Sequence, residues 1–338
     1  MQRCIKMAEK GLGKTFPNPL VGSVIVYKDN IIGEGWHQKA GSSHAEANAI
    51  SNVQNKEFLS KSTLYVSLEP CNHFGKTPPC SDLIIKNKIP RVVIASTDPN
   101  PLVAGKGIEK LKKAGCEVLV GVLKKEADFL NRRFFTFHNL KRPYIILKWA
   151  QTKNNFIAPI QKKTDNPEIF WITNNYSKQR VHKWRSEEAA ILVGVQTVIN
   201  DNPELTTREW TGNNPLRIVI DPNRRTPKNS KLFQDNIPTL FFTKDPIQLL
   251  PNKKEQKIVS PFSIKNILKE CYKLKIQSII IEGGLRTLEY FIKDNLWDEA
   301  RVFKTEKKIK TGIMAPEFKK ISNQTEIYEG DILDIYFN

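Results

Sequence analysis

The sequence predicts an α/β protein made of two domains, and three observations support this fold class. The chain has 338 residues, which is long enough for two complete hydrophobic cores. Short runs of β-branched and apolar residues alternate with segments of helical period along both halves. A basic, proline-containing break, Lys141-Arg142-Pro143, separates the two alternating series. We therefore predict one domain over residues 1–143 and a second over residues 144–338.

The first half begins with a predicted helix over residues 2–12, where apolar or small residues recur at helical spacing. Two strands, 21–27 and 31–36, flank Lys28-Asp29-Asn30 and are predicted to pair as a hairpin. The elements expected next are a helix at 44–53, a strand at 63–68, a helix at 81–87, a strand at 91–95, a helix at 107–114, a strand at 117–120 and a helix at 124–138. This alternation predicts a layered sheet with helices on its faces.

The second half repeats the same alternation. Its predicted elements are a strand at 144–149, a helix at 177–185, a buried strand at 189–195, strands at 216–220 and 239–243, a helix at 262–273 and a strand at 277–281. Residues 244–260 are polar and Lys-rich and show no pattern that indicates a function. The last predicted strand runs into Gly283-Gly284 and a further helix. A strand, a glycine pair and a helix form a layout that suits phosphate binding, although such a pair is commonly only a tight turn.

The composition is that of an ordinary globular protein, with 40% hydrophobic and 26% charged residues. The formal net charge of +18 is spread out: residues 1–143 hold 22 Lys/Arg against 12 Asp/Glu, and the remainder holds 31 against 23. Nucleic-acid-binding proteins concentrate positive charge in a patch or stripe. We therefore expect no nucleic-acid partner, while the excess would attract phosphorylated substrates.

No apolar run reaches the roughly 18 residues of a membrane span, and the N-terminal stretch is amphipathic rather than signal-like. We therefore expect a cytoplasmic protein with no membrane partner. Five cysteines in a long chain do not indicate a disulfide framework. Cys4, Cys116 and Cys271 lie in apolar-periodic segments and are expected to be core residues.

The remaining cysteines belong to a predicted zinc site with His44, Cys71 and Cys80 as ligands. One His and two Cys leave the fourth zinc position open for water, as in catalytic sites. Glu46 lies two residues after His44 and can shuttle protons as the catalytic acid/base. The sequence H-x-E followed by Pro-Cys is a signature of zinc nucleobase deaminases, but eight residues separate the cysteines here instead of two.

Two alternatives stay open at this point, a structural zinc site and a deaminase of a different kind. His73 is available as a fourth ligand, which would make the zinc site a closed, structural one. The chain would then be a non-enzymatic binding protein, and Glu46 would have no role. The second alternative is a deaminase of another nucleobase, such as tRNA adenosine, with an unrelated second domain.

The loop from Pro70 to Cys80 also carries a family resemblance. It reads P-C-x-H-x-G-x-T-P-P-C, with H-A-E before it and D-P-N-P-x-V-x-G-x-G after it. These motifs resemble the bifunctional deaminase/reductase family of riboflavin biosynthesis over almost the whole chain. The resemblance implies a cytidine-deaminase-like domain, 1–143, and a dihydrofolate-reductase-like domain, 144–338. It also implies Zn²⁺ and NADPH as cofactors, and we expect a homo-oligomer.

In the resembling family, residues matching Asn18, His37 and Lys76 bind the substrate of the deaminase. From the sequence alone, Asn18 reads equally as a turn residue between prolines, and His37 as an exposed histidine at a strand end. The implied first reaction is hydrolytic deamination of a diamino-pyrimidinone ribosyl phosphate. NADPH would then reduce the ribosyl group of the product to a ribityl chain, with the protein supplying binding and orientation.

The reductase half of the same family has Lys, then Ser-x-Asp-Gly-x-Ile-Ala, where this chain has Lys148 and then Thr152 to Ala158. Asn154 and Asn155 replace the Asp and the Gly. Because Asn tolerates positive φ better than other non-glycine residues, we expect Asn155 to keep the turn. We also expect the reductase half to be active despite both departures.

The resemblance assigns further residues of this half to the two ligands. NADPH contacts are implied for Lys148, Thr197, Asp201, Gly283, Gly284, Leu285, Arg286 and Thr287. Substrate contacts are implied for Trp171, Arg185, Leu205, Arg208 and Glu282. Arg185 and Arg208 are chemically suited to hold the ribose 5-phosphate by forked hydrogen bonds. No acid or base for the reduction is identifiable from the sequence.

Overall fold

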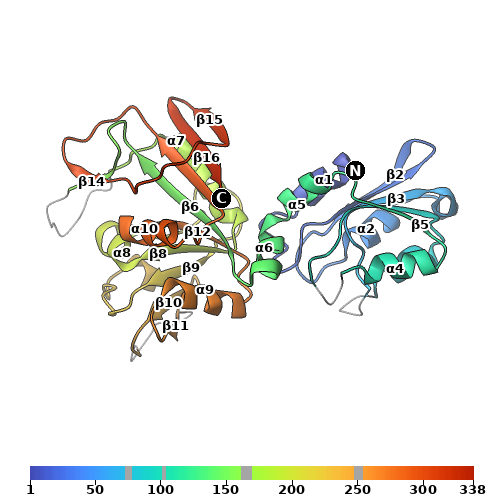
Figure 1. Ribbon diagram of the computed structural model, residues 1–338, viewed down its shortest axis with the longest axis horizontal. Helices are drawn as coiled ribbons and strands as arrows, with labels where there is room; N and C mark the ends of the chain where they lie inside the picture. The colour runs from blue at the N-terminus through green and yellow to red at the C-terminus, as the bar shows by residue number, and fades with distance from the viewer. Residues whose placement is uncertain (73–77, 101–103, 161–169, 247–253) are drawn as a thin grey trace. The chain divides into compact units, whose positions relative to one another are not determined.

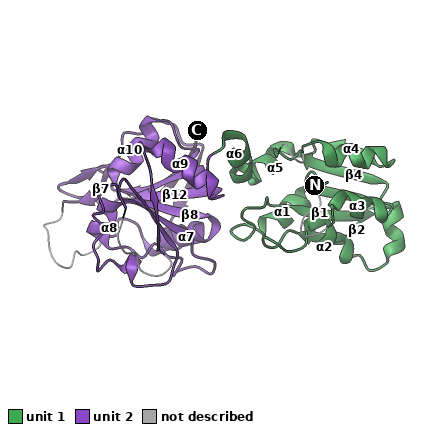
Figure 2. Ribbon diagram, turned by 90° about the horizontal axis from the view of Figure 1, so that it is seen from below, with its two compact units in different colours: residues 1–141 green, residues 142–338 purple. Residues whose placement is uncertain are grey.

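The computed structural model describes residues 1–72, 78–100, 104–160, 170–246 and 254–338. The chain divides into two compact units, Met1–Lys141 and Arg142–Asn338 (Figure 2). The division falls within two residues of the break that the sequence predicts. Each unit is described by itself below. Within the described ranges, no helix is long and apolar enough to cross a membrane.

Unit 1 is an α/β layer structure around one sheet (Figure 1). Its elements are α1 (Gln2–Glu9), β1 (Gly22–Tyr27), β2 (Asn30–Trp36), α2 (Ala45–Ser51), η1 (Lys56–Lys61), β3 (Thr63–Leu68), α3 (Cys80–Lys86), β4 (Arg91–Ser96), α4 (Lys106–Lys113), β5 (Glu117–Val120), α5 (Lys124–Leu130) and α6 (Arg132–Leu140). The strand order is β2-β1-β3-β4-β5. The first hairpin is antiparallel, whereas β3, β4 and β5 run parallel.

Helices cover both faces of this sheet, as the alternating pattern predicts. Ala49 of α2, Ile84 of α3 and Leu111 of α4 are fully buried in one cluster with Leu64 and Val92 of the sheet. On the other side, α1 contacts β1, and α5 contacts both α1 and β4. The unit therefore has the three layers expected of it.

The single helix predicted at 124–138 is wrong, because the chain breaks at Asn131 into α5 and α6. The Asn131 side chain is buried and pairs with the backbone of Leu20. It accepts from the Leu20 N–H at 2.8 Å and donates to the Leu20 carbonyl at 2.8 Å. Asn readily exchanges helical bonds for such side-chain pairing, and the loop before β1 is fixed as a result.

Unit 2 is built on a larger, mixed sheet with helices on both faces (Figure 1). Its elements are β6 (Tyr144–Gln151), β7 (Phe156–Pro159), α7 (Asn175–Glu187), β8 (Ala190–Gly194), α8 (Val195–Asp201), β9 (Leu216–Ile220), η2 (Lys231–Phe233), β10 (Thr239–Thr243), β11 (Lys254–Ile258), α9 (Ile264–Lys273), β12 (Ser278–Gly283), α10 (Leu285–Lys293), β13 (Glu299–Lys304), β14 (Gly312–Met314), β15 (Gln324–Tyr328) and β16 (Asp331–Phe337). The strand order is β11-β10-β9-β8-β12-β6-β13-β16-β15.

The two faces of this sheet carry separate cores. Residues of α9 and α10, such as Leu268 and Phe291, pack with Ile145 and Ile279 on one face. Residues of α7 and α8 pack with the opposite side chains of the same strands on the other face. Strands buried on both faces read as continuous apolar runs, which explains why β6, β8, β9, β10 and β12 were predictable.

Several elements of unit 2 were not predicted. Strand β11 has the polar sequence Lys-Glu-Gln-Lys-Ile, yet it pairs in parallel with β10 at the sheet edge. Helix α8 follows β8 at once, in a stretch with no predicted element. Strands β13 to β16 also lie outside the predicted elements.

Parallel pairing sets the positions of the functional segments of unit 2. Strand β12 lies between β8 and β6 and is parallel to both. The carboxyl ends of the three strands therefore meet at one edge, next to the point where the strand order reverses. Gly194 and Gly283 end β8 and β12, so α8 and α10 both begin at this edge.

We predict that Asn131→Ala destabilises unit 1 by about 2–3 kcal/mol, because it leaves the buried N–H and carbonyl of Leu20 unpaired. Hydrogen exchange of the full chain should show faster exchange at Leu20 and along α5 and α6. Lys113→Ala is the control, since it removes only an exposed ion pair with Glu109 and should change local stability by less than about 0.5 kcal/mol. Equal protection in both variants would contradict the proposed role of Asn131.

Candidate active sites

The predicted zinc ligands come together in unit 1. His44 is the N-cap of α2, Cys71 follows β3, and Cys80 is the first residue of α3. The His44 Nδ1 lies 3.5 Å from the Cys71 sulfur and 3.3 Å from the Cys80 sulfur. In a tetrahedral zinc site, with bonds of about 2.1 Å to nitrogen and about 2.3 Å to sulfur, such atoms are about 3.6 Å apart. The three donors therefore fit zinc.

The two cysteines are electrostatically prepared to bind a cation. A hydrogen bond from the Cys80 thiol lowers the pKa of Cys71 to about 4. The same shared proton, together with burial, raises the pKa of Cys80. The backbone N–H of Cys80, at the start of α3, also donates to the Cys71 sulfur at 3.3 Å. The Cys71 thiol therefore loses its proton more easily than an ordinary cysteine, which favours metal binding.

Glu46 lies beside this group in the first turn of α2 and is only 3% exposed. Burial raises its pKa to about 7, and the negative charge of Cys71 adds to the shift. A carboxylate with a pKa near neutrality can both accept and release a proton. The position therefore suits the acid/base role that the sequence predicts.

Asn18 and His37 lie next to the zinc ligands. The Asn18 Nδ2 is 3.0 Å from the His37 Nε2, and the His37 Nδ1 is 3.1 Å from the carbonyl of Ser43. Because that carbonyl only accepts, Nδ1 carries the ring proton and Nε2 accepts from Asn18. The His37 and His44 rings are 5.6 Å apart. His37 is buried, not exposed, and burial lowers its pKa. The predicted Lys76 and the alternative ligand His73 lie outside the described residues.

Glu69 is a functional candidate that the sequence analysis missed. Its buried carboxylate accepts four backbone N–H bonds from the chain after β4, given by Asp98 (3.2 Å), Gly105 (3.0 Å), Gly107 (3.0 Å) and Ile108 (3.3 Å). It thereby ties the segment just before Cys71 to the start of α4. The sequence feature that could have identified Glu69 is an acidic residue placed between an apolar strand and a Pro-Cys pair.

In unit 2, three predicted residues form a largely but not fully buried charged group. The Arg185 Nε and Nη2 donate to Glu282 at 2.8 and 2.9 Å, and the Lys148 Nζ is 3.6 Å from the same carboxylate. Burial alone would raise the pKa of Glu282, but the charges of Arg185 and Lys148 lower it to about 2. Burial also lowers the pKa of Lys148.

The glycine turn at 283–284 lies next to this group. A Cβ on Gly283 would be 2.8 Å from the Val193 side chain and 3.0 Å from the Thr197 hydroxyl, and a Cβ on Gly194 would be 2.6 Å from the Thr287 hydroxyl. Gly284 has a φ of 74° directly before α10. The backbone of two strands and two helix starts thus forms a close cradle with hydroxyl donors, which fits a phosphate-bearing cofactor.

The other predicted residues of unit 2 are spread around this edge. Leu205 is buried, whereas Asp201, Arg208 and Arg286 are exposed, and Leu285 opens α10. The ring of Trp171 lies 4.3 Å from the Lys178 ammonium, which also pairs with Glu209. The Arg185 guanidinium donates to Glu282 through two of its nitrogens, and the binding of the 5-phosphate by Arg185 and Arg208 stays a prediction. His182, which was not predicted, accepts from the Glu209 N–H at 3.4 Å, and burial lowers its pKa to about 4.

The two asparagines that depart from the family pattern fit their positions. Asn155 adopts a φ of 62°, so the expected turn before β7 is confirmed. The Asn154 amide donates to the Ile309 carbonyl at 2.7 Å and accepts from the Ile309 N–H at 3.3 Å. An aspartate could not donate the first of these bonds, so Asn154 has a structural use of its own.

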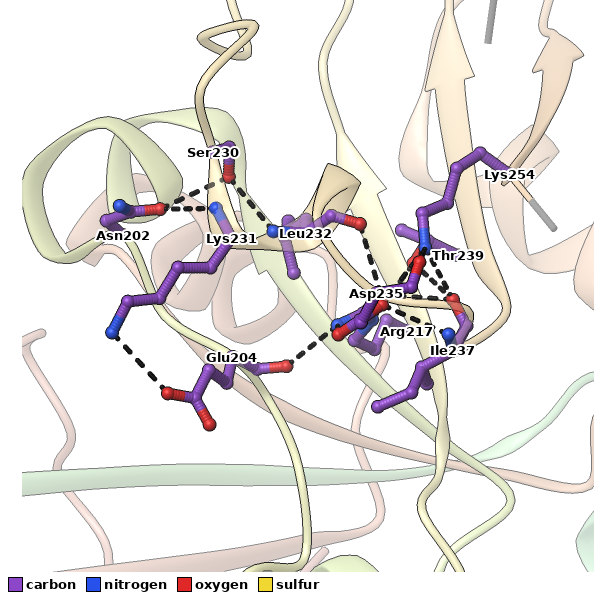
Figure 3. A network of polar contacts seen from close by, with 10 residues as sticks. All are labelled: Asn202, Glu204, Arg217, Ser230, Lys231, Leu232, Asp235, Ile237, Thr239 and Lys254. Atoms are coloured by element: carbon purple, nitrogen blue, oxygen red, sulfur yellow. Dashed lines mark hydrogen bonds and ion pairs between the residues drawn. The ribbon is translucent and has the colours of Figure 1, made fainter. Parts of the chain in front are cut away.

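A polar network holds Asn202 and Glu204, just before Leu205, in place (Figure 3). Arg217, fully buried on β9, donates to the Glu204 carbonyl at 3.1 Å and to both oxygens of Asp235 at 2.8 and 2.6 Å. Lys254 of β11 binds Asp235 from the other side at 3.1 Å. The Asn202 side chain accepts from the Lys231 N–H at 2.9 Å.

Comparison with known proteins identifies both units. Residues 1–96 match the cytidine and deoxycytidylate deaminase zinc-binding region, and residues 143–305 match the RibD C-terminal domain. The riboflavin biosynthesis protein RibD of Aquifex aeolicus is 44% identical over 309 residues, which is 90% of this chain and 85% of the relative. The chain belongs to the RibD family of riboflavin biosynthesis proteins.

Other RibD proteins agree with this assignment. The Escherichia coli protein is 33% identical over 90% of this chain and 86% of its own length. A crystal structure of the deaminase/reductase of Thermotoga maritima matches with a TM-score of 0.89 at 35% identity, covering 99% of this chain and 96% of that one. The predicted family and both predicted folds are confirmed. The alternative with an unrelated second domain is wrong, because that domain matches the RibD C-terminal domain.

We predict one zinc ion per chain, with Cys80→Ala losing most of it, because metal binding needs both thiolates. Metal analysis of the purified protein measures this directly. Cys116→Ala is the matched control, since Cys116 lies away from this group and contacts the Ile89 carbonyl. Full zinc retention in Cys80→Ala would remove this residue from the ligand set.

Proposed function

We propose that this chain catalyses two consecutive steps of riboflavin biosynthesis. Residues 1–143 deaminate 2,5-diamino-6-ribosylamino-pyrimidinone 5′-phosphate by hydrolysis, and residues 144–338 reduce the ribosyl group to a ribityl chain with NADPH. The observation that carries this proposal is the pair of preformed sites in one chain. One is the His44-Cys71-Cys80 group with Glu46, and the other is the Lys148-Arg185-Glu282 group beside the Gly283-Gly284 turn.

In the deaminase site, zinc held by His44, Cys71 and Cys80 supplies Lewis-acid activation of a water molecule. Glu46 takes a proton from the attacking water and delivers it to the departing amino nitrogen. One carbon–oxygen bond forms and one carbon–nitrogen bond breaks, so water is consumed and ammonia leaves. Asn18 and His37 hold the pyrimidine in position, since each orients the other through their 3.0 Å contact.

In the reductase site, NADPH supplies the hydride that reduces the sugar carbon. The reduction also consumes one proton, and Lys148 is the best placed of the charged trio to give it. Arg185 does not release its proton at neutral pH, and Glu282 has a pKa of about 2 and holds none. Desolvation lowers the pKa of Lys148 below its ordinary value, which makes its ammonium group a better proton donor. Glu282 keeps Lys148 and Arg185 in place.

The other residues of this half are assigned by their positions. Thr197, Gly283, Gly284 and Thr287 hold NADPH phosphate groups in the cradle, with Asp201, Leu285 and Arg286 around it. Trp171, Leu205 and Arg208 bind the substrate, and the exposed Arg208 is free to take its 5-phosphate by charge. The substrate is thus a small phosphorylated pyrimidine. A cytoplasmic location and a homo-oligomeric state stay predictions.

We predict that Glu46→Gln slows deamination by at least about 100-fold, because an amide cannot shuttle the proton. Ammonia release from the diamino substrate measures this step. Two readouts separate the proton role from misfolding: the variant should keep its zinc, and it should still oxidise NADPH when given the deaminated intermediate. Ammonia release at the parental rate would show that Glu46 is not the acid/base.

We predict that Gly284→Asp weakens NADPH binding at least about tenfold, because a carboxylate would stand beside the phosphates of the cofactor. NADPH titration of the full-length protein at fixed salt measures the dissociation constant. Gly115→Asp is the matched control, with the same added charge and a similar φ of 85°, but with open space around its Cβ. If Gly284→Asp binds NADPH as tightly as Gly115→Asp does, the glycine turn is not the cofactor site.

A further inference from the structure

Thr206 has a buried hydroxyl group that forms no hydrogen bond with the described residues. Among the residues that the structure describes, its Oγ1 has no hydrogen-bond partner, although only 9% of the residue is exposed. An unpaired buried hydroxyl costs about 1–3 kcal/mol, and native proteins contain few of them. A methyl group would fill the same space without this cost, so packing alone does not explain a threonine here.

The position of Thr206 connects it to the charged trio. Its carbonyl accepts from the Arg185 Nη1 at 3.0 Å, while the other two donor nitrogens of Arg185 bind Glu282. Thr206 also follows Leu205 directly and precedes Arg208 by two residues. The backbone of Thr206 therefore lies against the charged trio of the proposed reductase site.

The backbone around Thr206 is fixed from outside the site. Leu205 is held at a φ of 56°, and Asn202 at 38°, both in the left-handed region that is costly for most residues. The network of Figure 3 anchors the same segment, because Arg217 binds the Glu204 carbonyl and Asn202 binds the backbone of Lys231. Such anchoring keeps Thr206 from turning away to find a partner inside the protein.

We propose that the Thr206 Oγ1 hydrogen-bonds a sugar hydroxyl of the ribosyl phosphate substrate, which makes Thr206 a further substrate-binding residue of the reductase step. This inference rests on the proposed function. A neutral hydroxyl both donates and accepts, as a sugar hydroxyl does. Arg185, which donates to the Thr206 carbonyl, is already paired with Glu282, so this position favours a neutral polyol group over the phosphate. A site built to hydrogen-bond a substrate hydroxyl rejects analogues that lack it.

The adjacent Thr207 provides a matched comparison. It is as buried as Thr206, but its Oγ1 donates to the Asn213 carbonyl at 3.2 Å. Removing the hydroxyl should therefore have opposite effects at the two positions. Thr207→Val loses an internal hydrogen bond and should lower the melting temperature. Thr206→Val loses none in the free protein and should leave the melting temperature unchanged or raise it.

The test is calorimetric titration of the full-length protein with the deaminated intermediate, together with steady-state NADPH oxidation. Thr206→Val should weaken binding of the intermediate and raise its KM by about tenfold, as the loss of one hydrogen bond predicts. Thr206→Ser keeps a hydroxyl and should stay within about threefold of the parent. Thr207→Val should bind the intermediate as the parent does.

Three results would overturn the inference. The first is that Thr206→Val binds the intermediate as tightly as the parent. The second is that Thr206→Val and Thr206→Ser lose the same affinity for the intermediate. The third is a lowered melting temperature in Thr206→Val with unchanged binding, which would point to a buried water as the partner of the hydroxyl. A parent that binds the intermediate but does not oxidise NADPH would contradict the proposed function and leave the Thr206 comparison valid. A parent that does not bind it would overturn both.

Discussion

Parallel pairing of neighbouring strands is the constraint on which both sites depend. In unit 1, β3 and β4 end at the same edge, so Cys71 after one strand meets the chain after the other through Glu69. In unit 2, β6, β8 and β12 end together, which brings the glycine turn to Thr197 at the start of α8. Residues about 90 positions apart in the sequence share a site for this reason alone.

The two sites offset the desolvation free energy of their buried charges in different ways. In unit 1, two thiols share a proton beside His44 and present one thiolate, which suits a metal cation. In unit 2, the Glu282 carboxylate is balanced by Arg185 and Lys148, so the site is charged without a metal. A buried pair costs desolvation unless its geometry is good, and the two short bonds from Arg185 meet that condition. The proton transfer that we propose for Lys148 depends on this arrangement.

Local patterns carried much of the prediction. The apolar runs of β3, β9 and β10 identified those strands, and the spacing of His44, Cys71 and Cys80 identified a group whose members do lie together. Features that depend on residues distant in the sequence could not be predicted from local patterns. Asn131 breaks a helix because of Leu20, β11 is a strand because of β10, and Arg185 pairs with Glu282, which lies 97 positions further along the chain. Glu69 and Thr206 become functional candidates only through hydrogen bonds that the structure shows to be made or missing.

The central claim is that one chain carries both activities in sequence. It is tested most directly by giving the purified, zinc-loaded protein the diamino substrate and NADPH and following ammonia release and NADPH oxidation together. The account predicts that ammonia appears first, that NADPH oxidation follows after a lag, and that the two reach equal amounts. Ammonia release with no NADPH oxidation, even when the deaminated intermediate is supplied, would contradict it.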